Sequence, residues 1–255
     1  MSAPAKGKLY LVPAPLDFGC EILALLQDVM PLTTIQIAAQ LQHWICENAK
    51  STRAYLKRVG ELQPLKHQLQ ALQIQELPRE VHKKGDHTGN FGARPLLAAA
   101  LQGNDVGLVS EAGMPAIADP GSSVVRAAHD LGMQVVPLTG PMSLMLALAA
   151  SGLNGQNFAF AGYLPQAPNE RAQRIRELES LALKTGQTQI FIETPYRNTA
   201  LFQALLQTLQ GNTRLALSCG LTLPAGWSRS ALASGWKKIG PVPALDLPTV
   251  FCIGR

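Results

Sequence analysis

Three carboxylates come at or just after the end of a short apolar run in this sequence: Glu47, Glu111 and Glu193. Apolar runs of this length, bounded by turn residues, are typical of buried strands. An acid at a strand end can accept hydrogen bonds from ribose hydroxyls, pair with an ammonium group or take a proton. If the strands align, the three acids collect at one edge of the sheets, and this convergence indicates a site better than any one of them does.

The segment Ser110–Gly121 is rich in small residues and prolines. Small residues let a ligand approach backbone N–H and C=O groups closely, so we predict that this loop holds a small ligand with its main chain. The alternative is a tight strand-to-helix connection in which Asp119 is the helix N-cap and Pro120 its first residue. We favour that alternative for Asp119, whereas both roles stay open for Glu111.

Two further segments place polar side chains at the start of a predicted helix. Ser143 lies near the start of the apolar segment Pro141–Ala150, where it can bind a ligand or, more commonly, cap the helix. Lys50 and Arg53 accompany a basic helix that begins near Ser51. They can contact a phosphate or form a solvated helix face, and physical reasoning alone favours the solvated face.

Several familiar chemistries lack their motifs here. The sequence has no G-x-G-x-x-G after its first strand, no G-x-x-x-x-G-K-[ST] and no G-x-S-x-G, which argues against nicotinamide, nucleotide-triphosphate and serine-hydrolase sites. Its five histidines show no metal-ligand spacing and its four cysteines form no C-x-x-C pair, so we predict no metal site. Only His82 and His87, in a polar segment, stay candidates for a chemical role.

The composition is typical of a packed globular protein. The 255 residues, 47% hydrophobic and 15% charged, suffice for one large domain or two small ones. A net charge of +5 permits an anionic partner such as RNA without requiring one. The longest apolar stretch, Ser143–Ala150, is far shorter than the roughly 20 residues of a membrane span. Cysteines in apolar settings and the lack of a signal-peptide pattern at the start predict a cytoplasmic protein without a membrane segment.

Short apolar runs alternate with helical patterns, which predicts an α/β fold with mostly parallel or mixed sheets flanked by helices. About five strands precede Gly140 and four to five follow it, so we predict two lobes, 1–139 and 140–255, with a ligand cleft between them. The predicted strands are Leu9–Val12, His43–Cys46, Leu72–Leu77, Val106–Val109, Gln134–Pro137, Phe158–Tyr163, Gln189–Ile192, Arg214–Cys219 and Val250–Ile253, with further short strands in the tail. The predicted helices are Glu21–Met30, Ser51–Val59, Arg94–Gln102, Ser122–Leu131, Pro141–Ala150, Glu170–Leu183 and Asn198–Leu209, and Val81–Gly92 is a predicted loop.

Four motifs taken together resemble one known family. They are VSEAGMPAIADPG from Val109, VVPLTGPMS from Val135, ASGL from Ala150 and FAGYLP from Phe160. In their order and spacing the chain resembles the tetrapyrrole (corrin/porphyrin) methylase superfamily, and within it the branch of ribosomal RNA small-subunit 2′-O-methyltransferases. That branch usually has Asp and Thr at the positions of Glu111 and Met114. It also carries a C-terminal extension, which this chain, ending at Arg255, lacks.

The resemblance implies a two-lobed class III methyltransferase fold, usually a homodimer, that binds S-adenosylmethionine between its lobes. It implies that the N-terminal lobe serves the substrate and part of the cofactor site, and that the C-terminal lobe serves the cofactor and the dimer contacts. Carried onto this sequence, the family's cofactor contacts fall on Pro13, Ser110, Glu111, Ala112, Met114, Ile117, Ser143, Leu144, Glu193, Pro248 and Thr249.

We therefore expect in-line methyl transfer from S-adenosylmethionine, without a metal, to an acceptor that is most simply a ribose 2′-hydroxyl of ribosomal RNA. A hydroxyl acceptor needs a proton acceptor within about 3 Å. The candidate proton acceptors are Glu47, Glu193 and His82. The candidate phosphate-binding residues are Lys50, Arg53 and Arg197. The alternatives are a methyltransferase of the same fold for a small molecule or tetrapyrrole, and a non-catalytic module that binds S-adenosylmethionine.

Overall fold

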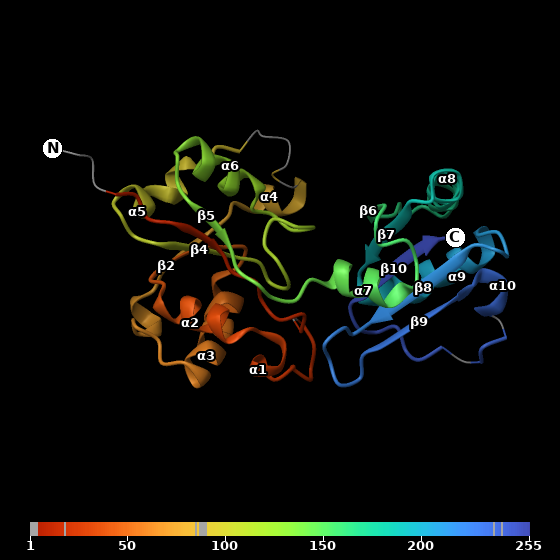
Figure 1. Cartoon of the computed structure of the whole chain (residues 1–255), viewed down its shortest axis with the longest axis horizontal. Helices are drawn as coiled ribbons and strands as arrows, with labels where there is room; N and C mark the ends of the chain where they lie inside the picture. Colours follow the sequence, from red (N-terminus) through yellow and green to blue (C-terminus); the bar gives the residue numbers. More distant parts are fainter. Residues whose placement is uncertain (1–4, 18, 85, 87–90, 237, 241) are drawn as a thin grey trace. The chain divides into compact units, whose positions relative to one another are not determined.

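The computed structural model of the chain describes residues 5–17, 19–84, 86, 91–236, 238–240 and 242–255. The chain forms two compact units (Figure 1), one of Met1–Gly19 with Leu23–Pro141 and the other of Cys20–Ile22 with Met142–Arg255. Each unit contains a five-stranded sheet covered by helices on both faces. The predicted α/β fold and the predicted strand counts are therefore confirmed in the part of the chain that the structure describes.

The sheet of the first unit is parallel in each of its strand pairs. Its strands follow the order β3-β2-β4-β1-β5. They are β1 (Leu9–Leu11), β2 (His43–Cys46), β3 (Gln73–Glu76), β4 (Val106–Val109) and β5 (Val135–Pro137). Because both faces of a parallel sheet are covered, its central strands are continuous apolar runs, which is why the sequence revealed them.

The helices of this unit form two layers. On one face lie α1 (Leu26–Val29), α2 (Leu32–Gln40) and α3 (Ala49–Leu62), and on the other lie η2 (Arg94–Leu97), α5 (Ala98–Leu101) and α6 (Ser122–Asp130). Two shorter elements are η1 (Leu69–Ala71) and α4 (Arg79–Lys84). Successive residues of β2 face opposite layers: Trp44 and Cys46 pack with α1–α3, and Ile45 packs with α5 and α6.

Three local details of this unit differ from the prediction. The predicted helix Glu21–Met30 is only α1, because tertiary hydrogen bonds hold the preceding residues: the Ala24 N–H donates to Asp17 Oδ2 (3.1 Å), and the Ala24 carbonyl accepts from Arg58 Nη2 (2.7 Å). Helix α2 was not predicted at all, since its Pro31 start and Thr33–Thr34 pair conceal a helical pattern. The predicted loop Val81–Gly92 also begins inside α4.

The sheet of the second unit is mixed, with the order β6-β7-β10-β8-β9. Only β6 and β7 are parallel among its strand pairs in the described residues, and the other pairs are antiparallel. The strands are β6 (Phe158–Tyr163), β7 (Thr188–Glu193), β8 (Arg214–Cys219), β9 (Trp227–Leu232) and β10 (Thr249–Gly254). The sequence predicted four of these strands by range, with boundaries that agree to within one or two residues, whereas β9 was expected only as an unplaced short strand.

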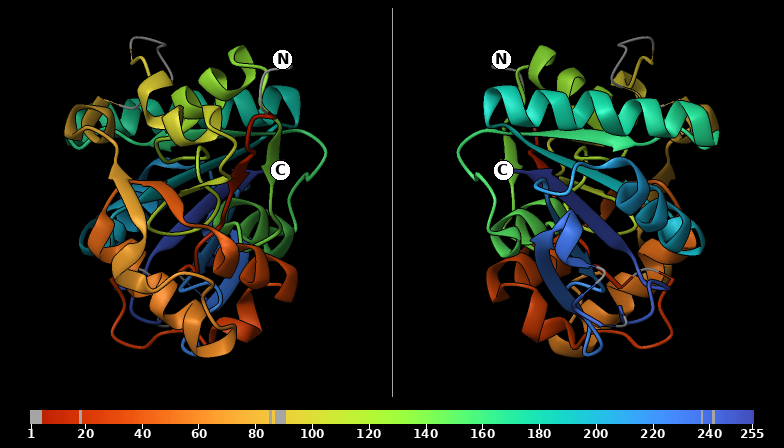
Figure 2. Two further views of the ribbon diagram at one scale, coloured as in Figure 1. Left: turned by 90° about the vertical axis from the view of Figure 1, so that its left-hand side faces the viewer. Right: turned by 90° about the vertical axis from the view of Figure 1, so that its right-hand side faces the viewer.

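Helices also cover both faces of this second sheet. Helix α7 (Ser143–Ser151) packs on one face, and α8 (Pro168–Thr185), α9 (Asn198–Thr208) and α10 (Ala233–Trp236) pack on the other, with the short η3 (Pro195–Arg197) before α9. The right-hand view of Figure 2 shows α8 running along the sheet at β6 and β7. In α7, Leu144 and Ala147 are buried whereas Met145 and Leu146 are exposed, so this apolar helix is covered on one side only. No helix in the described ranges is both long and apolar enough to cross a membrane.

Candidate functional site

The topology of the first sheet opens a crevice between its strands β1 and β4. Strands β1 and β4 are neighbours, but β1 continues into the α1–α3 layer and β4 continues into the α6 layer on the opposite face. Where the chain leaves two neighbouring strands toward opposite faces of the sheet, the two loops separate and leave a crevice at the carboxyl ends of the strands. Ligands of parallel α/β sheets bind in such crevices. The loops after Leu11 and Val109, both predicted to carry site residues, therefore flank this switch point.

Backbone hydrogen bonds join these two loops. The Ala14 N–H donates to the Gly113 carbonyl and the Gly113 N–H donates to the Ala14 carbonyl, each at 2.9 Å. Gly113 has φ +73°, a left-handed backbone conformation that would be strained in a residue with a side chain. Pro13 packs directly against Gly140, where a Cβ would lie 2.2 Å from Pro13 Cγ. The loops after β1, β4 and β5 are thus fixed to one another around the predicted cofactor residue Pro13.

A distant carboxylate holds the end of the loop between β4 and α6. Asp86 accepts hydrogen bonds from the N–H groups of Gly121 (2.9 Å) and Ser123 (2.8 Å), and from the hydroxyls of Ser122 (2.8 Å) and Ser123 (2.5 Å). Burial alone would raise the pKa of Asp86, but these hydrogen bonds outweigh it and lower the pKa. The N-cap of α6 is Gly121, so the prediction that Asp119 caps this helix was wrong.

The same loop contains strained backbone. Ala116 and Ala118 both have φ +65°, a left-handed conformation that costs a non-glycine residue about 1 kcal/mol or more. Such strain persists only where the surroundings hold it, and it is common at ligand-binding loops. Here the Asp86 contacts at one end and the Ala14–Gly113 bridge at the other hold the conformation.

Two of the three predicted strand-end acids meet at this edge. Cys46 is level with Val109 in the pairing of β2 with β4, which brings Glu47 and Glu111 together. The Glu111 N–H donates to Glu47 Oε1 at 3.4 Å, and Ser51 Oγ donates to Glu111 Oε1 at 3.3 Å. The predicted convergence is confirmed for these two acids, whereas Glu193 belongs to the second unit.

A third acid of the first unit was missed as a site residue. The pKa of Asp119 is raised to about 7, chiefly by burial and further by the negative charges of Glu47 and Glu111. An acid with a pKa near neutrality beside two other carboxylates is a candidate general base. The available signal was its position eight residues after Glu111 in the same small-residue loop, but the Asp-Pro-Gly pattern was interpreted as a helix start.

The crevice continues into a pocket of about 410 Å³. Its lining residues come from the loop after β1, the first half of α3 and the end of β4. They are Ala14, Pro15, Asp17, Gly19, Leu23, Asn48, Lys50, Ser51, Thr52, Ala54, Tyr55, Arg58, Val109, Ser110 and Glu111. Asp17 and Arg58 form a bidentate ion pair in the pocket lining, with Nη1–Oδ1 at 3.1 Å and Nη2–Oδ2 at 3.0 Å. The pocket thus contains the predicted residues Ser110, Glu111 and Lys50.

The remaining predicted residues of the first unit lie on its surface or along the loop. Ala112 and Met114 are half-buried, and Ile117 is exposed. Lys50 and Arg53 are exposed on the first turns of α3. That helix begins at Ala49, earlier than predicted, because the Asn48 side chain caps it by accepting from the N–H groups of Lys50 (2.8 Å) and Ser51 (3.2 Å). The side chain of His82, in α4, lies outside the described residues, and so does His87.

In the second unit, Glu193 and Thr249 are paired across β7 and β10. The Glu193 carboxylate is buried and bound by Arg197, with Oε1–Nη2 2.8 Å and Oε1–Nε 2.9 Å, and it accepts from the Thr194 N–H at 2.7 Å. Arg197 also stacks on Tyr196, its Cζ 5.2 Å from the ring centroid. The charges of Glu193 and Arg197 are therefore committed to each other, which makes both less suited to the roles of proton acceptor and phosphate ligand that the sequence suggested.

Three other predicted residues of this unit have clear positions. Ser143 is the first residue of α7, and its N-cap is Met142 without a side-chain bond, so the capping alternative for Ser143 was wrong. Leu144 is buried against Val250 and its neighbours. Pro248 is exposed, just before β10. Within the described ranges, no group of three or more His, Cys, Asp or Glu side chains is arranged to hold a metal ion.

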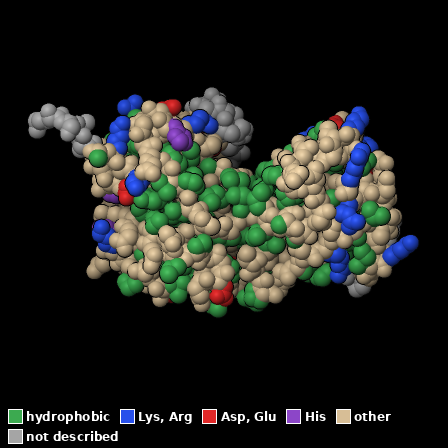
Figure 3. All heavy atoms as spheres, in the orientation of Figure 1, with side chains coloured by type: hydrophobic (Ala, Val, Ile, Leu, Met, Phe, Trp, Pro, Cys, Tyr) green, Lys and Arg blue, Asp and Glu red, His purple; other side chains and the backbone are tan. Residues whose placement is uncertain are grey.

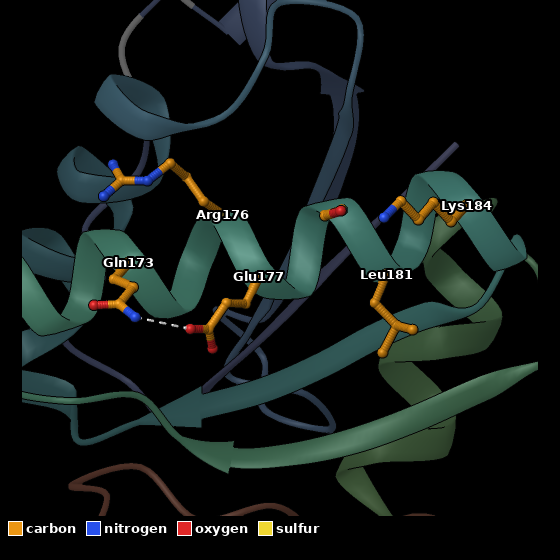
Figure 4. A pocket seen from close by; sticks show the side chains of 6 residues that line it. Gln173, Arg176, Glu177, Leu181 and Lys184 are labelled. Carbon is orange, nitrogen blue, oxygen red and sulfur yellow. Dashed lines mark hydrogen bonds between the residues drawn. The ribbon is translucent and has the colours of Figure 1, made fainter.

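A second hollow lies on the surface of α8 (Figure 4), with a volume of about 540 Å³. Gln173, Arg176, Glu177, Ser180, Leu181 and Lys184 line it. Gln173 donates to Glu177 at 3.1 Å, while Arg176 and Lys184 extend from the helix as separate cations. It contains none of the predicted site residues and is formed by side chains of one helix, so we regard it as part of a charged surface and not as the catalytic site.

Comparisons with known proteins agree with the resemblance. Residues 33–226 match the family model for Tetrapyrrole (Corrin/Porphyrin) Methylases. A protein of Mesorhizobium japonicum named ribosomal RNA small subunit methyltransferase I is 33% identical over 86% of this chain and 65% of its own length. One of the same name from Vibrio cholerae is 37% identical over 54% of this chain and 46% of its own length. The chain thus spans less than two-thirds of these relatives.

A solved structure shows the same fold. The uroporphyrin-III-C-methyltransferase from Thermus thermophilus aligns with a TM-score of 0.52, covering 98% of this chain and 94% of that one, at 20% sequence identity. At this identity the likeness concerns the fold alone, and it agrees with the α/β fold predicted from the sequence.

Proposed function

Because the chain belongs to the tetrapyrrole (corrin/porphyrin) methylase family, we propose that it is an S-adenosylmethionine-dependent methyltransferase whose acceptor is a ribose 2′-hydroxyl of small-subunit ribosomal RNA. The relatives named as ribosomal RNA methyltransferases support the choice of acceptor. The structural observation that carries the proposal is the group of acids at the switch point, where Glu47 contacts Glu111 just beyond β4 and both raise the pKa of Asp119 in the same loop.

The residues of the first unit fit an S-adenosylmethionine site. Ser110 is 6% exposed and its hydroxyl has no partner among the described residues, so it can serve a ligand. Beyond it, the loop through Gly113 offers small residues and main-chain groups, as the methionyl and ribose parts of the donor require. In the second unit, Ser143, Leu144, Glu193 and Thr249 remain the proposed cofactor residues. When bound, the sulfonium supplies an activated methyl group with an excellent leaving group.

The protein's own chemical task is then alignment and proton removal. An in-line displacement needs the acceptor oxygen held near the donor carbon, and water excluded from the gap. A hydroxyl nucleophile must also lose a proton, and we assign Asp119 as the acceptor with Glu47 and Glu111 raising its pKa. Glu193 is less suited to this role because Arg197 already neutralises it.

Contacts to the RNA backbone are assigned to the exposed cations of α3. Lys50 lines the pocket and Arg53 is exposed one turn further along α3, and neither has an acidic partner in the described residues. Replacing both with alanine should weaken RNA retention more at low salt than at high salt, since phosphate contacts act by releasing counterions. Lys66→Ala, an exposed lysine outside the pocket, is the matched control. Equal RNA binding by the double variant and wild type at both salt concentrations would remove this assignment.

Two measurements test the activity itself. Calorimetry with S-adenosylhomocysteine tests the shared premise, and absence of heat at millimolar ligand would overturn the methyltransferase proposal. Transfer of labelled methyl groups into 16S ribosomal RNA, compared with protein-free small-molecule extract and porphyrinoids, then identifies the acceptor. Label in the small-molecule fraction alone would point to a small-molecule methyltransferase, and binding without any transfer would point to a non-catalytic binding module.

A homodimer and a cytoplasmic location complete the proposal. Both follow from the family assignment and from the ribosomal RNA substrate, which is found in the cytoplasm. Sedimentation equilibrium with the full chain tests the first: a single species at the mass of one chain, across micromolar concentrations, would contradict it.

A further inference from the structure

We propose that the pocket between the loop after β1, helix α3 and the end of β4 binds the acceptor nucleoside of the RNA, with the Tyr55 hydroxyl as a hydrogen-bond partner of the base or ribose. This inference rests on the proposed RNA methyltransferase function and specifies which part of the chain receives the methyl acceptor. The volume of about 410 Å³ lies in the range of pockets that enclose small ligands.

Two buried hydroxyls in the pocket lining have no partner. Tyr55 and Ser110 are each 6% exposed, and neither Tyr55 Oη nor Ser110 Oγ has a hydrogen bond within the described residues. Buried polar groups in folded proteins are normally paired, because an unpaired one costs about 1–3 kcal/mol. The two hydroxyls come from different elements, α3 and the end of β4, and both line the same cavity. Because Ser110 is already proposed for the methyl donor, the Tyr55 hydroxyl is the one left for a second ligand bound beside it.

The distribution of charge selects an uncharged ring system over a polyanion. Arg58, a half-buried cation in the lining, already binds Asp17 and the Ala24 carbonyl. Burial raises the pKa of Tyr55, so this side chain stays a neutral hydroxyl at physiological pH. At the rim, Lys50 offers one exposed positive charge. Besides the Asp17–Arg58 ion pair, the lining contains one further carboxylate, Glu111. A lining with this carboxylate inside and a single cation at its mouth suits a nucleobase and ribose inside and one phosphate outside, and it does not suit a porphyrin with many carboxylates.

The lining also separates the acceptor from the methyl donor. Of the donor residues proposed for the first unit, only Ser110 and Glu111 line the pocket, while Pro13, Ala112, Met114 and Ile117 do not. The rest of the lining comes from α3 and the loop after β1. The pocket therefore adjoins the proposed donor loop at one side and extends from it toward α3, which is the arrangement that methyl transfer between two bound molecules requires.

Two variants probe the pocket without touching the acids. Tyr55→Phe removes one oxygen, and Ala54→Trp fills the pocket from an exposed position of α3. We expect Tyr55→Phe to raise KM for RNA roughly 3- to 10-fold, the effect of one neutral hydrogen bond. Ala54→Trp should raise KM by roughly tenfold or more, since it removes the space for a whole base. Neither should change the dissociation constant of S-adenosylhomocysteine. Tyr10→Phe and the exposed Ala71→Trp, both outside the lining, are matched controls.

A direct probe separates this inference from the proposed function. The four ribonucleoside 5′-monophosphates are titrated into wild type and Tyr55→Phe at saturating S-adenosylhomocysteine, and the Tyr55 variant should bind them more weakly. If wild type methylates no RNA but binds a monophosphate through Tyr55, the proposed function fails and the nucleoside pocket stands. If RNA is methylated while both variants keep the wild-type KM, the pocket assignment is overturned. Weaker S-adenosylhomocysteine binding in both variants would overturn it as well, by assigning the pocket to the donor.

Discussion

At the scale of single residues, Asp119 differs most from its sequence-based interpretation. It was expected to cap α6, but the capping carboxylate is Asp86, which lies 35 residues before Gly121 in the chain. A local Asp-Pro-Gly pattern cannot reveal that a distant side chain has taken the capping role. The proximity of Glu47 and Glu111, by contrast, could be predicted, because neighbouring parallel strands end at the same edge of the sheet.

Asp119 gives a prediction with a definite sign. Its pKa is raised to about 7 in the folded protein from 3.8, so the native state holds a proton that the unfolded chain releases. Between pH 4 and pH 7 this lowers the stability of the wild type as pH rises, and above pH 7 the effect is complete. Asp119→Asn should therefore gain melting temperature relative to wild type as pH rises through this window, as scanning calorimetry at several pH values can show.

The same substitution should also abolish the rise of kcat with pH near 7, and lower kcat at pH 8 by roughly 10²-fold or more, if Asp119 accepts the proton. The exposed Asp28→Asn is the control for removal of one negative charge. A melting-temperature difference that is the same at pH 4.5 and pH 8 would show that Asp119 is not protonated in the native state. An unchanged pH–rate profile would leave Glu47 as the remaining described candidate of this unit.

At the scale of elements, the sequence predicted most strands and long helices but missed those shaped by distant contacts. The apolar runs of β4 and β8 have the predicted boundaries, since burial on both faces leaves a strong local pattern. The segment Glu21–Leu25 has helical spacing, yet Asp17 and Arg58 hold it in another conformation. The mixture of parallel and antiparallel strands in the second sheet likewise arises because β10 inserts between β7 and β8. No local sequence pattern predicts this insertion.

The anchor of the β4–α6 loop can be tested on its own. Asp86→Ala removes four hydrogen bonds to a buried carboxylate and should lower the free energy of unfolding by about 2–3 kcal/mol at pH 7. Because the folded pKa of Asp86 is lowered, its contribution is present above the unfolded pKa of 3.8 and is lost as pH falls through the folded value. Urea denaturation at pH 7 and pH 3 should therefore show a smaller difference between variant and wild type at pH 3.

Asp130→Ala, at the exposed C-terminal end of α6, is the matched control and should change the free energy of unfolding by no more than about 0.5 kcal/mol. Since the loop also carries Ser110–Ile117, Asp86→Ala should weaken S-adenosylhomocysteine binding although Asp86 itself is not a proposed ligand residue. Full cofactor affinity in a variant with reduced stability would mean that the loop keeps its conformation without this anchor.

At the scale of the whole molecule, the positive charge is unevenly divided. The first unit has 12 basic and 11 acidic residues, and the second has ten basic and six acidic ones. Two acids of the second unit, Glu179 and Glu193, are buried, so its surface is more basic than the count suggests. Figure 3 shows Lys and Arg side chains along the side of this unit that carries α8, with few acidic ones between them. A basic surface of this kind suits a polyanion, so under the proposed function it is a candidate second contact for the RNA backbone.

Helix α8 provides the test. Arg176 and Lys184 are exposed beside the hollow of Figure 4, and neither has an acidic partner in the described part of the chain. Reversing both charges, Arg176→Glu with Lys184→Glu, should weaken RNA binding at low salt. The slope of log affinity against log salt concentration should become less steep by about 1.5, which corresponds to the loss of two phosphate contacts. The double variant Gln173→Ala with Ser180→Ala, on the same face, is the uncharged control. Because neither side chain lines the pocket of Tyr55 or is a proposed donor residue, methyl transfer to a free mononucleotide or short oligonucleotide should be unaffected. A slope equal to that of wild type would show that RNA binding depends on the first unit alone, through Lys50 and Arg53.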